Sequence, residues 1–197
     1  MTGLILLAAG ASTRLGKPKQ KLLFEGRTLI YRAAESAVAS GCEPVVVVLG
    51  AYAEVIAEEL LPLKVELALN SEWEAGMGAS IRCGLSKLLA VAPAVEACLL
   101  MVCDQPFVDV QLLQKLLQAR AATGKGIAAC TYQNTLGTPA VFGKTYFTDL
   151  LGLEGQQGAR RLLQQHLHDV EAVPFPEGAI DVDTAADFTA LLNHTRS

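Results

Sequence analysis

The feature that most constrains the fold is a regular alternation of short apolar runs with longer segments of helical pattern. The apolar runs are Gly3–Ala8, Pro44–Leu49, Val65–Leu69 and Ala97–Val102. Short, nearly continuous apolar runs are typical of central parallel strands that are covered on both faces. The helical segments are Thr28–Ser40, Ala53–Leu61, Ser80–Val91 and Val110–Ala122, and Gly41 and Pro62 end the first two.

Strands that alternate with helices predict a three-layer α/β/α fold with a mostly parallel sheet and right-handed crossovers. The second half of the chain is less regular. We expect strands at Ile127–Tyr132 and Ala140–Phe142 around a Gly-Thr-Pro turn, helices at Tyr146–Leu151 and Ala159–His166, a last strand at Val170–Pro174 and a terminal helix that Thr184 caps. No linker, repeat or low-complexity tract interrupts the pattern, so we interpret residues 1–197 as a single domain.

Composition excludes several classes of protein. Hydrophobic residues make up 51% of the chain and the net charge is −4, so neither disorder nor a basic surface for nucleic acid or anionic membrane is indicated. No apolar run approaches the ~20 residues of a membrane span, and Leu4–Ala9 lacks the cationic region that precedes a signal sequence. The five cysteines form no CxxC pair and no zinc spacing. We therefore expect a cytoplasmic protein whose cysteines are reduced and packed as small apolar residues. They are Cys42, Cys83, Cys98, Cys103 and Cys130.

A loop rich in small residues and cations follows the first predicted strand. The small residues Ala8, Ala9, Gly10 and Ala11 allow the backbone to approach a ligand and to present amide groups to phosphate oxygens. Four cations follow within eight residues, a local concentration that an acidic protein needs to bind a triphosphate. They are Arg14, Lys17, Lys19 and Lys21. The loop is neither a Rossmann GxGxxG nor a Walker A motif. A solvated loop without a ligand is the alternative.

Two further segments follow predicted strands. Asn70–Arg82 contains glycines on either side of Met77, Gly76 and Gly78, which favour close approach to a flat ligand, and Ser80 is expected to cap the following helix. Asp104 ends the fourth apolar run, where a carboxylate is well placed to hold Mg²⁺. Each has a plainer alternative, a tight loop in the first case and a turn or helix cap in the second.

A pair of acidic residues lies near the end of the chain. Asp181 and Asp183 are two residues apart and would point the same way on a strand. Asp183 is equally able to cap the helix that follows.

These motifs together resemble the MobA-like nucleotidyltransferases, which include the molybdenum cofactor cytidylyltransferases. The resemblance rests on four motifs: LAAG-x-S-x-R-L-G-x-P-K-Q from Leu7, N-x5-GM-x-x-S-I from Asn70, the D-x-P of Asp104 and the I-D-V-D-T of Ile180. The first loop is also similar to that of the methylerythritol-phosphate cytidylyltransferases. The resemblance covers nearly the whole chain and implies the Rossmann-like, GT-A-like sheet of the nucleotide-diphospho-sugar transferases.

The resemblance also implies roles for single residues. Arg14 and Lys19 would neutralise the triphosphate, with Lys21 a lesser candidate, and Asp104 and Asp183 would hold Mg²⁺. The nucleotide contacts that it implies are Leu7, Ala8, Ala9, Gly10, Asn70, Gly76, Met77, Gly78 and Ser80. Ala9 favours CTP, because LAAG tends to accompany cytidine in this family. Gly137–Phe142 and Gly155–Arg160 resemble the segments that face the acceptor, but Gln156 stands where the family has aspartate and leaves the acceptor open.

The expected reaction is transfer of NMP from an NTP, with Mg²⁺, to a phosphorylated acceptor and release of pyrophosphate. Because an acceptor phosphate is already ionised near neutral pH, positioning and charge neutralisation suffice. The resemblance implies molybdopterin as acceptor and a hand-over to molybdoenzymes or their chaperones. A sugar or polyol phosphate acceptor and a non-catalytic nucleotide-binding module are the alternatives. A nucleotide-sugar glycosyltransferase is disfavoured, because Asp104-Gln105-Pro106 is not the D-x-D expected there.

Overall fold

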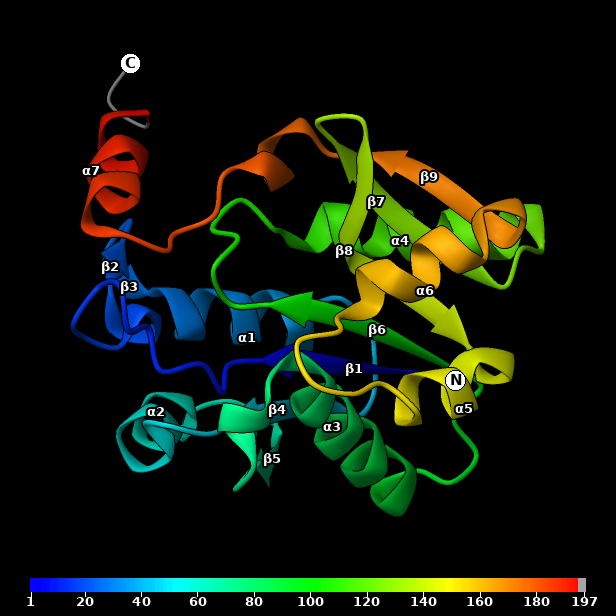
Figure 1. Ribbon diagram of the computed structural model, residues 1–197, viewed down its shortest axis with the longest axis horizontal. Coiled ribbons are helices and arrows are strands. Elements are labelled where there is room, and N and C mark those ends of the chain that lie inside the picture. Colours follow the sequence, from blue (N-terminus) through cyan, green and yellow to red (C-terminus); the bar gives the residue numbers. More distant parts are fainter. Residues whose placement is uncertain (195–197) are drawn as a thin grey trace.

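A seven-stranded sheet forms the centre of the molecule in the computed structural model, which describes residues 1–194 (Figure 1). The strand order is β5-β4-β1-β6-β8-β7-β9. The strands are β1 (Thr2–Leu7), β4 (Val45–Leu49), β5 (Glu66–Leu69), β6 (Ala97–Val102), β7 (Ile127–Tyr132), β8 (Thr135–Gly143) and β9 (Val170–Pro174). Strand β8 runs antiparallel to both of its neighbours, and the other pairs are parallel. The mostly parallel sheet is confirmed.

Helices cover both faces of the sheet. One face packs against α1 (Leu29–Ala39), α2 (Ala53–Leu60) and α4 (Val110–Thr123), and the other against α3 (Met77–Val91), α5 (Phe147–Leu151) and α6 (Ala159–Gln165). Strand β1 divides its side chains between the two cores: Leu4 and Leu6 face the first, and Ile5 and Leu7 the second. An apolar residue at every position is what a strand covered on both faces requires, so the three-layer prediction is confirmed. None of the described helices is long and apolar enough to cross a membrane.

A third, small core joins the two ends of the chain. The short strands β2 (Leu23–Phe24) and β3 (Arg27–Thr28) form a hairpin whose Leu22 and Phe24 pack against Val182 and against Leu191 of α7 (Ala185–His194). Figure 1 shows α7 beside this hairpin. The amide of Val182 also donates to the carbonyl of Asp104 at 3.1 Å. These contacts bring the C-terminal segment to the carboxyl ends of β1 and β6.

The predicted cap of the last helix is confirmed. Thr184 Oγ1 accepts from the amide of Asp187, and the carboxylate of Asp187 accepts in return from Thr184 and from the amide of Asp183. This reciprocal arrangement is a capping box. It holds the backbone of Asp183 directly before α7. The prediction of a strand at Asp181 and Asp183 is wrong, because this segment belongs to no strand.

Three other predictions of local structure need correction. Strand β5 is an edge strand, and Leu67 and Leu69 are exposed on one of its faces, so it is not covered on both faces as its apolar pattern predicted. The predicted Gly-Thr-Pro turn lies inside β8, and the chain instead turns at Gln133 and Asn134, which both take positive φ as a tight hairpin requires. Ser80 does not cap α3, because the helix already begins at Met77.

Candidate functional site

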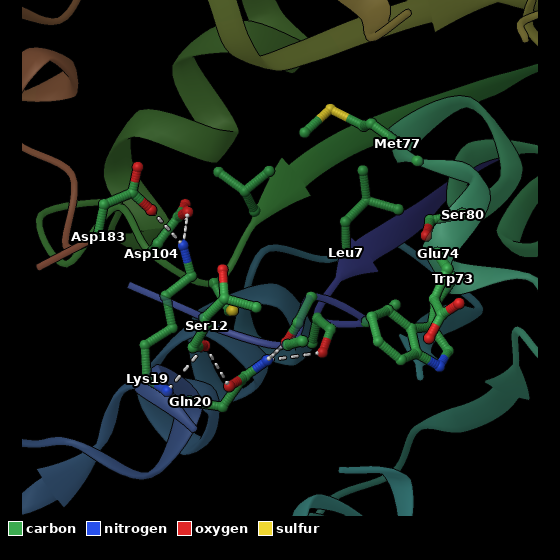
Figure 2. Close-up of a pocket in the computed structure, with 18 of the residues that line it drawn as sticks. Leu7, Ser12, Lys19, Gln20, Trp73, Glu74, Met77, Ser80, Asp104 and Asp183 are labelled. Atoms are coloured by element: carbon green, nitrogen blue, oxygen red, sulfur yellow. Dashed lines mark hydrogen bonds and ion pairs between the residues drawn. The ribbon is translucent and has the colours of Figure 1, made fainter. Parts of the chain in front are cut away.

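A pocket of about 430 Å³ opens at the carboxyl ends of β1 and β6, where open α/β sheets bind ligands. Segments from both ends of the chain line it. The lining residues are Leu7–Arg14, Lys19, Gln20, Trp73, Glu74, Gly76, Met77, Ser80, Val102, Cys103, Asp104, Gln156 and Asp183. Figure 2 shows Lys19, Asp104 and Asp183 at one side of this pocket and Trp73, Glu74 and Ser80 at the other, with Leu7 between them.

The charged side is a network of two cations and two carboxylates. The ammonium of Lys19 donates to Asp104 Oδ2 at 2.6 Å and to Asp183 Oδ1 at 2.7 Å (Figure 2). Arg14 donates from Nη2 to the second oxygen of Asp183 at 2.7 Å. The side chain of Lys19 is only 14% exposed, whereas that of Arg14 is 68% exposed. Lys19 is therefore enclosed within the site, whereas Arg14 reaches Asp183 from the solvent-exposed side.

The network determines which groups carry charge. Burial alone lowers the pKa of Lys19, but the charge and hydrogen bond of Asp104 and the hydrogen bond of Asp183 outweigh it and raise the pKa. Burial raises the pKa of Asp183, and its bonds to Lys19 and Arg14 lower it by more, so the net shift is downward. Lys19 and Asp183 are therefore both held in their charged forms.

The opposite side of the pocket is less charged and partly aromatic. Trp73 lies in a short 3₁₀ turn, Trp73–Ala75, that leads into α3. Ser80 lies in the first turns of α3, where its Oγ accepts from Asn70 Nδ2 at 3.0 Å. Asn70 itself is buried behind the pocket and accepts from the amide of Glu72. An indole and a fixed hydroxyl suit the binding of a flat, polar ring.

The two glycines beside Met77 meet a distant loop as well as the pocket. Gly76 has φ of +107°, and a Cβ there would lie 2.5 Å from the carbonyl oxygen of Gly155. The amide of Gly78 donates to that same oxygen at 3.1 Å. Only glycine fits at Gly76, because the positive φ and the close approach both exclude a side chain. These contacts hold Gln156 at the pocket wall.

The structure brings most of the predicted site residues together, with three exceptions. Lys21 is turned outward and pairs with Glu59 at 3.2 Å. Asn70 contacts the pocket through Ser80, and Gly78 packs against Leu153 and Glu154 outside the lining. Leu7, Ala8, Ala9, Gly10, Arg14, Lys19, Gly76, Met77, Ser80, Asp104 and Asp183 all line the pocket.

Residue patterns alone missed several pocket residues. Gln20 is buried and bonds the backbone of the first loop, Ser12 accepts from the amide of Lys19, and Trp73 lines the far side. A buried amide within a run of charged residues is the only signal that marks Gln20, and the chain's single tryptophan the only one that marks Trp73.

The cysteines carry no chemistry in this arrangement. All five are free thiols, and four are buried. Burial, and then the charge of Asp104, raises the pKa of Cys103 to about 12. Because the thiolate is the reactive form, Cys103 is inert at neutral pH although it lines the pocket.

The carboxylates fit a divalent cation of the magnesium class. Asp104 and Asp183 converge on one point, since a single ammonium bonds both of them. Within the described residues no group of three or more potential ligands gathers. Mg²⁺ is commonly bound by one or two carboxylates together with substrate phosphates and water, so two carboxylates beside a cationic loop suffice.

Comparison with known proteins assigns the chain to a family. Residues 4–170 match the model of the MobA-like NTP transferase domain. The chain is 33% identical over 201 residues, 95% of each protein, to nicotine blue oxidoreductase of Paenarthrobacter nicotinovorans. The crystal structure of Rv0371c from Mycobacterium tuberculosis H37Rv covers 98% of this chain and 97% of its own, with 28% identity and a TM-score of 0.82.

Two further structures bear on the fold and the metal. A nucleotidyl transferase from Methanothermobacter thermautotroptrophicus, Mth528, has a TM-score of 0.81 at 21% identity over 98% of this chain and 97% of its own, which shows a shared fold. Rv0371c has also been solved as a complex with manganese, with a TM-score of 0.79 and 27% identity over 98% of this chain and 97% of that one. The chain belongs to the MobA-like NTP transferase domain family.

Proposed function

We propose that the protein transfers CMP from CTP to the phosphate of molybdopterin or its molybdenum cofactor and releases pyrophosphate. The observation that carries the proposal is the convergence of Arg14, Lys19, Asp104 and Asp183 at one side of a nucleotide-sized pocket. Within an acidic protein, this side combines cations for a triphosphate with carboxylates for a metal ion. A non-catalytic binding module has no need of the carboxylate pair.

The reaction is an in-line displacement at the α-phosphorus. An oxygen of the acceptor phosphate forms a bond to this phosphorus while the bond to the bridging oxygen breaks, and the electron pair leaves with pyrophosphate. The acceptor is ionised near neutral pH, so no side chain has to remove a proton. Arg14 and Lys19 neutralise the charge that grows on the departing pyrophosphate. Trp73 and Ser80 hold the base and fix the α-phosphate relative to the acceptor.

Asp104 and Asp183 are the residues that would hold Mg²⁺. When bound, the ion neutralises phosphate charge and makes the α-phosphorus more electrophilic. Lys19 pairs with these same carboxylates, so its ammonium and the ion compete for the same oxygens. The phosphate oxygens of a bound nucleotide would give Lys19 an alternative partner.

The acceptor is the less supported part of the proposal. Gln156 lines the pocket wall and brings no charge to the acceptor. Molybdopterin rests on the family resemblance, and a sugar or polyol phosphate uses the same chemistry. Hand-over of the product to molybdoenzymes or their chaperones follows only if molybdopterin is the acceptor.

One relative favours a second candidate function. Nicotine blue oxidoreductase aligns with 95% of this chain, and its name states a redox activity. The corresponding candidate here is transfer of two electrons, as hydride, from a reduced nicotinamide dinucleotide bound in the same pocket to an oxidised organic substrate, which is reduced as the dinucleotide is oxidised. This reaction does not use the carboxylate pair, so nucleotidyl transfer is the better supported of the two.

Pyrophosphate release tests the proposal directly. The purified protein is incubated with each of the four NTPs and Mg²⁺, with and without molybdenum cofactor or a sugar phosphate. We expect release with CTP that depends on molybdenum cofactor. Release that depends only on the sugar phosphate selects the other acceptor class. No release with any pair, together with oxidation of NADH or NADPH in a parallel assay, refutes nucleotidyl transfer and supports the redox candidate.

A further inference from the structure

We propose that Gln20 is a positioning residue that orients the backbone amides of the first loop toward the phosphates of the bound nucleotide. This inference rests on the proposed function, because it concerns how the same pocket recognises an NTP. Gln20 touches no reacting atom in this account. It acts through the peptide groups of Ala8 to Ala11.

The side chain of Gln20 is buried, and all its polar atoms have partners. Its exposed fraction is 1%, although it lies in a charged stretch between Lys19 and Lys21. Both hydrogens of Nε2 are used: one bonds the carbonyl of Ala8 and the other that of Gly10, each at 2.9 Å. Its Oε1 accepts from Ser12 Oγ at 3.4 Å. Three groups within one short loop, the carbonyls of Ala8 and Gly10 and the hydroxyl of Ser12, are thus joined through one amide (Figure 2).

The direction of the loop amides follows from peptide geometry. In a trans peptide the C=O and the next N–H point in opposite directions. Because Gln20 holds the carbonyls of Ala8 and Gly10, the N–H groups of Ala9 and Ala11 point away from it. The carbonyl of Ala9 is held in turn by the amide of Ala51 at 3.1 Å. All three carbonyls therefore have a donor within the protein, Gln20 for two of them and Ala51 for the third.

The amides are left for a ligand. Within the described part of the chain, the N–H groups of Ala9, Gly10 and Ala11 have no protein acceptor, and these residues line the pocket. Successive backbone amides that face one cavity form a site for phosphate oxygens. Gly10 meets no atom within 4 Å of an added Cβ, so packing provides no restraint at Gly10 itself, although Ala8 and Ala9 are buried. The amide of Gln20 provides that restraint.

A packing role alone does not explain the choice of glutamine. A methionine has nearly the same length and suits a buried position better, but it donates no hydrogen bond to either carbonyl. Without the two bonds the peptide groups can rotate, and carbonyl oxygens would then face the phosphates. Loss of these two hydrogen bonds should therefore weaken binding of the phosphates of a nucleotide and leave the contacts with its base and sugar unchanged.

The test compares CTP with cytidine on wild-type protein and on Gln20→Met. Trp73 is the only tryptophan and lines the same pocket, so its fluorescence reports binding, with cytidine titrated into the millimolar range. We expect Gln20→Met to weaken CTP binding by roughly 10- to 100-fold, the scale of losing one or two hydrogen bonds to a charged group. Cytidine binding should change by less than about threefold, since cytidine makes no phosphate contact.

Two controls separate positioning from general loss of structure. Ser40→Ala removes another buried hydrogen bond, from Ser40 Oγ to the carbonyl of Ala37. It should change neither the affinity for CTP nor the affinity for cytidine. Gln20→Asn keeps the amide on a shorter side chain and should give an intermediate effect on CTP, which provides a readout if Gln20→Met does not fold. Equal weakening of CTP binding and cytidine binding, or unchanged CTP binding, would contradict the role of Gln20 without contradicting the proposed function. Failure of wild-type protein to bind any of the four NTPs would overturn the proposed function as well.

Discussion

At the scale of single residues, the proposed function assigns two kinds of ligand to the surroundings of Lys19. Its ammonium has three hydrogens, and two of them bond Asp104 and Asp183. A divalent ion needs the same carboxylate oxygens, and a triphosphate needs the same ammonium. Binding of the two ligands is therefore coupled through one side chain.

Replacement of Lys19 tests this coupling without any turnover. In Lys19→Met the carboxylates of Asp104 and Asp183 lose their shared partner and repel each other, so a cation gains more by binding them. We expect Mn²⁺, measured by electron paramagnetic resonance without nucleotide, to bind about tenfold more tightly than to wild type. Lys17→Met is the matched control, because Lys17 belongs to the same loop but pairs with neither carboxylate. Equal affinity of Lys19→Met and wild type would contradict the coupling.

Asp104 is the residue whose loss should be most damaging to turnover. Asp104→Asn keeps the size of the side chain and removes the charge that offsets a divalent ion. We expect turnover to fall by roughly 100-fold or more, the scale of losing one aimed electrostatic group, while the urea midpoint changes little. Asp183→Asn should act in the same direction but more mildly, because phosphates and water partly replace it. Normal turnover of Asp104→Asn at low Mg²⁺ would remove Asp104 from the metal site.

At the scale of elements, apolar pattern predicted the strands that are buried on both faces. Strands β1, β4 and β6 were found within one residue of their observed bounds, because every side chain of these strands meets a core. Strand β5 has the same apolar pattern but lies at the edge. Pattern alone does not distinguish a central strand from an edge strand, since strand order depends on long-range pairing.

The prediction of where an element begins was wrong where contacts with a distant segment determine that start. Helix α3 begins at Met77 because Gly76 and Gly78 lie against Gly155, which is 77 to 79 residues away in the chain. Local capping rules pointed to Ser80 instead. The pairing of Lys19 with Asp183 spans 164 residues. The family resemblance assigned both residues to one site but did not predict this ion pair. The roles of Gln20 and Trp73 depend on the loop geometry and were not predicted.

Asp169 links three elements on the side of the sheet away from the pocket. It ends a 3₁₀ turn, Leu167–Asp169, before β9, accepts from the amide of Gly126 before β7 at 2.9 Å and accepts from the hydroxyl of Tyr146 before α5. The bonds from Tyr146 and then from Gly126 lower the pKa of Asp169. Burial, and then the bond to Asp169, raises the pKa of Tyr146 to about 12. The carboxylate form is thus the one that the fold favours.

The pH dependence of stability tests this link. A carboxyl whose pKa is lower in the folded state stabilises the fold above its unfolded pKa, near 4, and loses that contribution as pH falls through the folded value. We expect Asp169→Asn to reduce the free energy of unfolding by about 1 kcal/mol at pH 7, a value that allows for solvent screening. The difference from wild type should shrink below about pH 4 in urea unfolding curves. A difference that is constant between pH 7 and pH 3 would exclude a charge effect.

At the scale of the whole molecule, the pocket is formed by parts of the chain that lie far apart in the sequence. The first loop, the 73–80 segment, the end of β6 and the segment before α7 each supply lining residues. The small core of Leu22, Phe24, Val182 and Leu191 holds the last of these in place. A ligand that contacts all four segments binds only the folded chain, so its binding energy adds to the stability of the whole fold.

Nucleotide binding should therefore raise the melting temperature in a base-dependent and metal-dependent manner. At a ligand concentration of about 100 times Kd the gain is about 2.7 kcal/mol, which corresponds to roughly 5–10 °C for a chain of this size. We expect CTP with Mg²⁺ to give the largest shift of the four NTPs in differential scanning fluorimetry. Asp104→Asn should lose the part of the shift that depends on Mg²⁺ and keep the part that cytidine alone produces, since Trp73 and Ser80 are unchanged. If the four NTPs raise the melting temperature equally, the pocket does not discriminate between the bases. If none of them shifts the melting temperature with or without Mg²⁺, the pocket is not a nucleotide site, and the carboxylate pair must serve another ligand.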